Sequence, residues 1–95
     1  MTMNFMQANM KIMKILCNPN RFAIIALLSK STKEDLCVNQ ISQKVGISQS
    51  LASHQLSYLE ASGVVVSTRM GQLVCYSLAS TSLVKTILKV IKLLG

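Results

Sequence analysis

Residues 38–62 read VNQISQKVGISQSLASHQLSYLEAS, and this stretch predicts two helices joined by a tight turn. The first helix opens at Val38 or Asn39, and Gly46 stands where a helix often adopts a left-handed cap. Ser48 is the natural N-cap of a second helix over residues 49–62. We therefore expect a helix-turn-helix, although many core helix pairs share this spacing.

The next stretch, GVVVSTRMGQLVCYSL at residues 63–78, makes the pattern more specific. Gly63 ends the second helix, and residues 64–69 are mostly β-branched, which favours a strand. Residues 70–72 predict a tight turn, and residues 73–78 predict the partner strand of a hairpin. A hairpin directly after a helix-turn-helix is typical of the wing of a winged helix.

Further helices are predicted on both sides of this unit. Asn18 caps a helix that begins at Pro19, a short strand is expected at residues 36–38, and Ser80 or Ser82 caps a last helix. The apolar stripe of the first helix, at residues 3–16, is Met6, Met10, Met13 and Leu16, and that of the last helix is Leu83, Ile87, Val90 or Ile91, and Leu94. The expected fold is mainly α with a β-hairpin wing (α+β), in the order α-α-(β)-α-α-β-β-α. It forms a single winged helix-turn-helix domain over residues 1–95.

The composition limits the class of protein. The chain has 95 residues, of which 51% are hydrophobic and 14% are charged. One small core cannot cover that much apolar surface, so we expect a homodimer. The net charge of +7 favours a polyanionic ligand, and no run approaches the ~18 uncharged apolar residues of a membrane span. One histidine, three acids and no glycine-rich phosphate loop argue against an enzyme.

Small polar side chains gather on one side of the second helix of the helix-turn-helix. Free N–H groups at its start suit a phosphate oxygen, glutamine can pair with adenine, and serine can serve several bases. Two hairpin residues are placed to reach the adjacent minor groove or the DNA backbone. The predicted DNA-binding residues are Ser48, Gln49, Ser50, Ser53, His54, Gln55, Tyr58, Arg69 and Gln72. The predicted partner is double-stranded DNA, which this helix contacts in the major groove.

Three segments together resemble the ArsR family of winged-helix repressors. NPNRFAIIALL at residues 18–28 resembles the family's second helix, which typically opens with a turn, a proline and an arginine two positions later. SQSLASHQLSYLEASGVV at residues 48–65 resembles the recognition helix, and TRMGQLVCYSL at residues 68–78 resembles the wing. The resemblance implies a transcriptional repressor whose terminal helices, about residues 3–16 and 82–94, build the dimer interface. A symmetric dimer places two recognition helices ~34 Å apart, so the operator is expected to be an inverted repeat.

The cysteines Cys17, Cys37 and Cys75 form an odd, widely spaced set, which differs from a secreted disulfide scaffold. Because the N-terminus is also not a convincing signal peptide, we expect a reducing, cytoplasmic location. Apolar surroundings predict inert thiols, although Cys75 alternates along its strand and is expected to be the most exposed. A redox or effector role of these three thiols stays an open alternative.

Many ArsR relatives bind metal at the third helix or on the last helix. The predicted last helix has no His, Asp, Glu or Cys, which excludes such a site there. At the third helix, Cys37 stands where the site usually begins, but the second thiol position holds Asn39. We therefore expect no metal and no cofactor, with Cys37 as a buried structural thiol.

Two other interpretations stay open. A winged helix can dock a protein instead of DNA, and only DNA binding weakens steeply with salt. The last helix carries Lys85, Lys89 and Lys92 on one face, which also fits a basic helix on a membrane surface. We favour the dimer interface for this helix and place Leu88 in it. The sequence determines neither the operator nor the signal that releases the protein from it.

Overall fold

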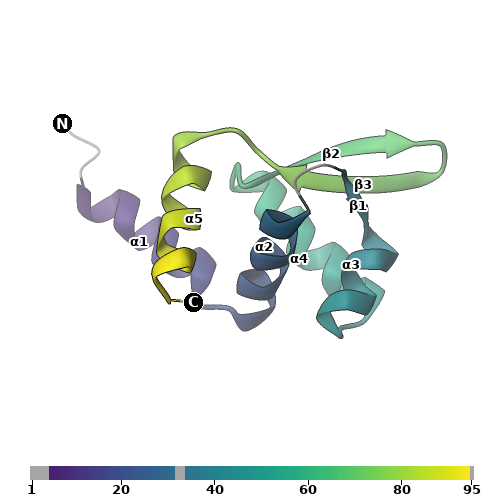
Figure 1. Cartoon of the computed structure of the whole chain (residues 1–95), viewed down its shortest axis with the longest axis horizontal. Helices are drawn as coiled ribbons and strands as arrows, with labels where there is room; N and C mark the ends of the chain where they lie inside the picture. Colours follow the sequence, from purple (N-terminus) through teal and green to yellow (C-terminus); the bar gives the residue numbers. More distant parts are fainter. Residues whose placement is uncertain (1–4, 32–33, 95) are drawn as a thin grey trace.

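A computed structural model describes the backbone of residues 5–31 and 34–94, and the side chains of those residues from Asn9 onward. The elements are α1 (Phe5–Leu16), α2 (Pro19–Lys30), β1 (Leu36–Cys37), α3 (Val38–Val45), α4 (Gln49–Ala61), β2 (Val65–Met70), β3 (Leu73–Leu78) and α5 (Ser82–Leu94). This order confirms the winged helix-turn-helix expected from the sequence (Figure 1). The predicted start of the first helix at residues 3–4 and the side chain of Met6 lie outside the described part of the chain.

Local sequence explains where the helices begin and end. The Asn18 side chain accepts hydrogen bonds from the backbone N–H groups of Asn20 and Arg21 at 2.9 and 3.1 Å, as predicted for the cap of α2. The Ser48 hydroxyl accepts from the N–H of Leu51 at 3.0 Å and caps α4. The predicted cap of α5 is wrong, because Thr81 rather than Ser80 or Ser82 accepts from the N–H of Val84 at 3.2 Å.

The short turn between α3 and α4 depends on a glycine. Gly46 has a φ of 85°, in the left-handed region that favours glycine. The N–H groups of Gly46 and Ile47 both donate to the carbonyl of Ser42, at 2.8 and 3.0 Å. Ile47 then packs against the core. These contacts hold the two helices of the helix-turn-helix at a defined angle.

The strands form one antiparallel sheet in the order β1-β3-β2. β2 and β3 are the predicted hairpin, in which Met70 pairs with Leu73 beside the turn at Gly71. β1 adds two residues at the other edge of β3, where Cys37 lies opposite Cys75. The central position of β3 therefore links the wing to the residue that precedes α3.

The core lies under the helices and the root of the wing. Fully buried side chains come from α1, α2, α3, α4, the start of the wing and α5: Ile15, Ile24, Ile25, Ile41, Leu56, Leu59, Val64 and Ile87. Their helical spacing gives α4 and α5 one buried face each. The opposite face of each helix is left for solvent or for partners.

The molecule is elongated, with principal extents of 43 × 25 × 24 Å. α1 and α5 lie together at one end, whereas the β2–β3 wing extends at the other (Figure 1). Within residues 5–31 and 34–94, no single helix has the length and apolarity to cross a bilayer; Asn9–Leu16 and Pro19–Lys30 meet that test only as a pair bent by 96°.

Candidate nucleic-acid interface

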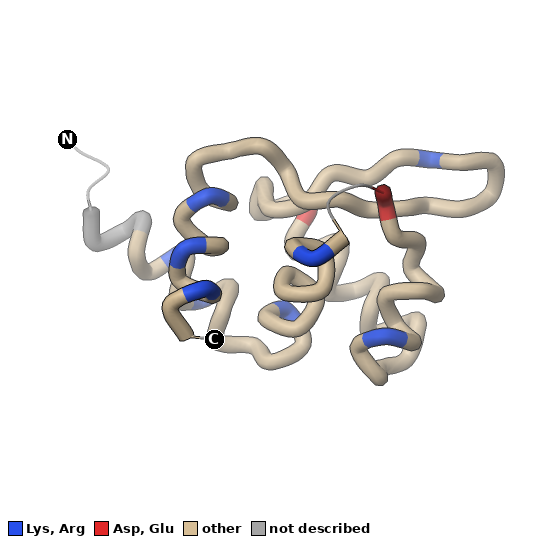
Figure 2. The backbone as a smooth tube through the Cα atoms, in the orientation of Figure 1, with Lys and Arg blue, Asp and Glu red and all other residues tan. Residues whose placement is uncertain are grey.

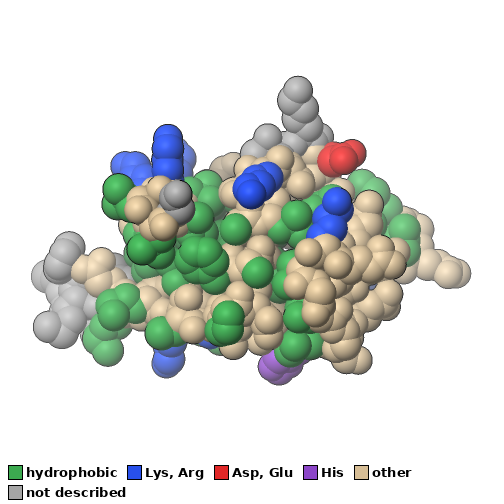
Figure 3. Space-filling view, turned by 60° about the horizontal axis from the view of Figure 1, so that its bottom comes forward, with side chains coloured by type: hydrophobic (Ala, Val, Ile, Leu, Met, Phe, Trp, Pro, Cys, Tyr) green, Lys and Arg blue, Asp and Glu red, His purple; other side chains and the backbone are tan. Residues whose placement is uncertain are grey.

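The outer face of α4 presents small, uncharged side chains. Ser50, Ser53 and His54 are exposed, as the sequence predicts, and the single histidine stands out from the surface in Figure 3. Ser57 is exposed on the same face and is a residue that the sequence interpretation missed, although its spacing of four from Ser53 is a usable signal. α4 contains no Lys or Arg, so this face offers hydrogen-bonding groups without positive charge.

Gln55 is a correction to the predicted set. Its side chain is 6% exposed, and its Oε1 accepts a hydrogen bond from Arg21 Nη1 at 3.1 Å. The side chain therefore points into the molecule and does not belong with the outward-facing residues. The spacing 52-55-56-59 of the buried positions on α4 is the helical signal that the polar character of glutamine obscures.

Tyr58 lies at the border between the outer face and the body of the molecule. It is 36% exposed, and the guanidinium carbon of Arg21 lies 4.2 Å from the centroid of its ring. One face of the ring is thus used within the protein. The remaining exposed part of the ring faces outward beside the outer face of α4.

The wing brings two more predicted residues near the helix-turn-helix. Gln72 at the turn and Gln49 at the start of α4 both line a hollow of about 410 Å³. Arg69 is exposed on β2 near the tip of the wing. The hydroxyl of Ser67 donates to the carboxylate of Glu60 at 2.7 Å, which ties β2 to the end of α4.

The same region perturbs one titratable group. Burial raises the pKa of the Tyr76 phenol, and the negative charge of Glu60 raises it further. Tyr76 is therefore a neutral core residue of β3, opposite Ser67 in the hairpin.

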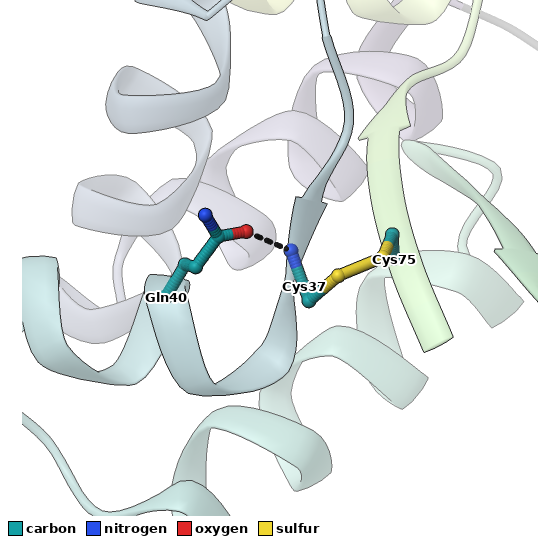
Figure 4. The surroundings of a disulfide bond; sticks show 3 residues. All are labelled: Cys37, Gln40 and Cys75. Carbon is teal, nitrogen blue, oxygen red and sulfur yellow. Dashed lines mark hydrogen bonds between the residues drawn. A yellow bond between two sulfur atoms is a disulfide. The ribbon is translucent and has the colours of Figure 1, made fainter. Parts of the chain in front are cut away.

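Two of the three cysteines are joined. Cys37 and Cys75, 38 residues apart in the sequence, form a disulfide between β1 and β3 (Figure 4). The backbone N–H of Cys37 also donates to Gln40 Oε1 at 2.9 Å, so Cys37 stands at the start of α3. Cys37 is half-buried and lines the hollow that Gln49 and Gln72 share.

This arrangement corrects two predictions about thiols. Cys37 is not a buried free thiol, and Cys75 is not the most exposed cysteine, because its side chain is only 1% exposed. β3 is the middle strand, which β1 and β2 flank on both sides. Cys17 carries the exposed free thiol instead. Among the described residues, no three His, Cys, Asp or Glu side chains lie close enough together to hold a metal ion.

The positive charge lies mainly away from α4. Lys85, Lys89 and Lys92 are exposed along α5, and Figure 2 shows these basic positions at the opposite end of the molecule from the wing. Lys11 and Lys14 of α1 add to the charge of that end. The net charge therefore does not mark the outer face of α4.

An apolar groove of about 500 Å³ lies between α1 and α5. Its lining residues are Asn9, Ile12, Met13, Leu16, Cys17, Thr86, Val90 and Leu94. Met13 is 64% exposed at this groove, and hydrophobic side chains gather at the same end of the molecule in Figure 3. Leu88 does not line it, because Leu88 faces a separate hollow with Leu28 and Leu78.

Comparisons with known proteins agree with this geometry. The sequence profile described as bacterial regulatory protein, arsR family, matches residues 18–67. Nodulation protein NolR of Rhizobium meliloti is 37% identical over 70 residues, which are 74% of this chain and 55% of that protein. HTH-type transcriptional repressor SmtB of Mycobacterium tuberculosis is 33% identical over 78 residues, which are 82% of this chain and 56% of that protein. The chain thus spans about half the length of the curated relatives it matches.

A solved structure shares the fold over nearly the whole chain. HlyU from Vibrio cholerae N16961 superimposes with a TM-score of 0.80 at 26% identity, covering 97% of both chains. The likeness includes the terminal helices, which lie outside the match to the family profile.

Proposed function

Because the chain belongs to the ArsR family of bacterial regulatory proteins, we propose that it is a transcriptional repressor that binds a specific double-stranded DNA sequence as a homodimer in the cytoplasm. The matching family is one of bacterial regulatory proteins, and SmtB is a transcriptional repressor, which agrees with the prediction that the chain is not an enzyme.

The observation that carries this proposal is the outer face of α4. Helix-turn-helix proteins insert the second helix of the motif into the major groove, where side chains bond to base edges. Ser50, Ser53 and His54 are exposed, short enough for close approach, and free of internal hydrogen bonds that involve their side chains within the described residues. The wing residues Arg69 and Gln72 are assigned to the neighbouring backbone or minor groove.

The groove between α1 and α5 supports the dimer. Exposed apolar side chains there are better covered by a second copy than by water. Because the outer face of α4 lacks cations, one half-site gives modest affinity, and two half-sites are needed for tight binding. The operator is therefore an inverted repeat whose halves lie about one DNA turn apart.

Selection of bound fragments from random double-stranded DNA tests the proposal and identifies the operator. The variant Ser53→Ala with His54→Ala should bind that operator roughly 10- to 100-fold more weakly, since a good base contact contributes about 1–3 kcal/mol. Gln43→Ala, which removes an exposed polar side chain from α3, is the matched control and should bind normally.

Two results would contradict the proposal. If the double variant gave an unchanged footprint on the operator, Ser53 and His54 of α4 would not contact its bases. Failure to select any sequence, or binding that barely responds to salt, would favour the alternative of a protein-docking winged helix.

A thiol-responsive version of the repressor is a second candidate that the disulfide favours. Disulfides in cytosolic proteins are rare and are usually transient or redox-sensing. The Cys37–Cys75 bond joins the start of α3 to the middle strand of the wing sheet, so forming it restrains the wing against the helix-turn-helix. Of the two joined cysteines, half-buried Cys37 is more accessible to an oxidant than Cys75, whereas exposed Cys17 takes no part in the bond.

Hydrogen peroxide can supply the oxidising equivalents for this bond. The Cys37 thiolate attacks hydrogen peroxide and becomes a sulfenic acid, and a hydroxide leaves and takes up a proton to form water. Cys75 then displaces the second oxygen, which leaves as water, and the disulfide forms. A dithiol such as dithiothreitol reduces the disulfide back to two thiols and is itself oxidised to a disulfide.

Anisotropy with the selected operator tests the response. The oxidised form should bind at least about five-fold more tightly than the form reduced by dithiothreitol, because the tied wing is already ordered. Cys75→Ser should bind the operator with the same affinity before and after peroxide treatment. Cys17→Ser, which removes the exposed free thiol, should respond to peroxide like the chain without substitutions. Equal affinity of both redox forms would exclude the switch.

A further inference from the structure

Arg21, near the start of α2, contacts both α1 and α4 through its guanidinium group. Its Nε donates to the carbonyl of Ile15 at 3.1 Å, and its Nη2 donates to the carbonyl of Lys14 at 2.9 Å. Its Nη1 donates to Gln55 Oε1 at 3.1 Å, and its guanidinium carbon lies 4.2 Å from the centroid of the Tyr58 ring. One side chain of α2 thus bonds both to the end of α1 and to two residues of α4.

The end of α1 needs such a partner. The last four carbonyls of a helix lack intrahelical donors and carry partial negative charge. The carbonyl of Met13 accepts from the N–H of Cys17 at 2.8 Å, and Arg21 supplies the donors for the two carbonyls that follow. The guanidinium satisfies these groups and also has its own charge compensated by them.

The α4 side of the contact involves one buried and one half-covered residue. Gln55 has its amide oxygen bonded to Arg21 in a position that is 6% exposed, so a change in the rotation of α4 would break that bond. Tyr58, one turn away, stacks against the same guanidinium. Two contacts one turn apart on one helix define its rotation better than either alone.

We propose that Arg21 is a positioning residue that sets the rotation of α4 relative to the end of α1, and thereby the angle at which a dimer presents the reading face to DNA. The proposal rests on the proposed function, because α1 is assigned to the dimer interface and α4 to the major groove. Arg21 does not contact the DNA in this role, since three of its donor groups and one face of its guanidinium are already used within the protein.

Lysine is the informative replacement. It keeps the positive charge, but its compact ammonium cannot span three acceptors and a ring in the planar arrangement of a guanidinium. The matched control is Lys30→Arg, the reverse exchange at an exposed position near the end of the same helix.

The first measurement compares two DNA ligands. Arg21→Lys should remain dimeric by sedimentation, bind the selected operator about 10- to 100-fold more weakly, and bind unrelated DNA within about two-fold of the unmodified chain. The slope of log affinity against log salt should not change, since no phosphate contact is lost. Equal losses on both ligands together with a shallower slope would show that Arg21 contacts phosphate and would overturn the proposal, as would full retention of operator binding.

The second measurement needs no DNA, and it uses a second variant in case Arg21→Lys folds poorly. Gln55→Met keeps the size of the side chain but removes the acceptor for Arg21, and the Tyr58 ring protons then report by NMR on the stacking. Both Arg21→Lys and Gln55→Met should shift these ring signals, whereas Lys30→Arg should not. Unchanged ring signals would overturn the proposal, whereas shifted signals in a chain that selects no DNA would contradict only the proposed function.

Discussion

The two ends of the molecule differ mainly in their positive charge. The end formed by α1 and α5 exposes large apolar side chains, including Met13 and the 86%-exposed Leu93, beside five exposed lysines. The end formed by α4 and the wing exposes serine, histidine and glutamine, and it also exposes the apolar wing residues Val66, Met70 and Leu73. Its exposed basic residues are Arg69 of β2 and Lys44 of α3. The net charge of +7 is therefore concentrated where we place self-association, and the reading face is nearly neutral.

This difference separates two tasks that a DNA-binding protein has to perform. Affinity for any DNA comes from cations near phosphates, whereas selectivity comes from contacts with base edges. A nearly neutral reading face contributes selectivity but little non-specific affinity. Tight binding therefore depends on dimerisation through the end formed by α1 and α5.

The largest effect is expected from Val90→Asp, which places a charge in the groove between α1 and α5. A buried unpaired carboxylate is costly, so the dimer should dissociate and the operator affinity should fall by more than about 100-fold. Sedimentation and anisotropy measure both quantities. Leu93→Asp is the control, because Leu93 lies beside Lys89 and Lys92 outside the groove, and this variant should stay dimeric. If Val90→Asp remained a dimer, or if Leu93→Asp became a monomer, this placement of the interface would be wrong.

Reduction of the disulfide should affect the wing end alone. Opening a bond between cysteines 38 residues apart should lower the free energy of unfolding by about 2–4 kcal/mol, measured by urea titration with and without dithiothreitol. Hydrogen exchange should quicken in β1 and β3, whereas α5 should keep its protection in the native state. Cys75→Ser should unfold at the same urea concentration with and without dithiothreitol.

Salt should act in opposite directions at the two ends. The exposed lysines lie outside the groove but at the same end of the molecule, so those of two paired copies repel each other at a distance, and this repulsion is screened as the ionic strength rises. Raising NaCl from about 50 to 500 mM should therefore strengthen dimerisation a few-fold while it weakens binding to DNA. A dimer that weakens with salt would show that the lysines are paired with acidic groups of the second copy.

The smallest effect is expected from Arg69→Gln at the wing. Loss of one phosphate contact should weaken binding to all DNA sequences by a few-fold and reduce the salt slope by about 1. Lys89→Gln removes the same charge from the opposite end and should leave the slope unchanged. Equal effects of the two variants would contradict the separation of the ends.

Much of the fold was predictable because its signals are local. Asn18 and Ser48 cap their helices by bonds to N–H groups two or three residues away, and Gly46 provides the left-handed turn between α3 and α4. The wing follows from two runs of strand-forming residues around Gly71. The misassigned cap at Thr81 is a choice among adjacent hydroxyl side chains that spacing alone does not resolve.

The candidate site was predictable where exposure follows helical spacing, and was wrong where a distant partner intervenes. Ser53 and His54 are exposed as the pattern predicts. Gln55 is predicted to bind DNA because glutamine can pair with adenine, but its side chain is buried and its Oε1 accepts a hydrogen bond from Arg21, 34 residues earlier. Cys75 is predicted to be the most exposed of the three cysteines, but it lies on the middle strand, is bonded to Cys37, and is only 1% exposed.

The sequence by itself determined the helices, the hairpin, their order and the outward positions of α4, since these depend on propensities and bonds within about four residues. The tertiary structure alone decided that Arg21 joins α1 to α4 and that Cys37 meets Cys75. Contacts between residues more than thirty positions apart depend on how the packed core brings segments together, and no local pattern records that arrangement.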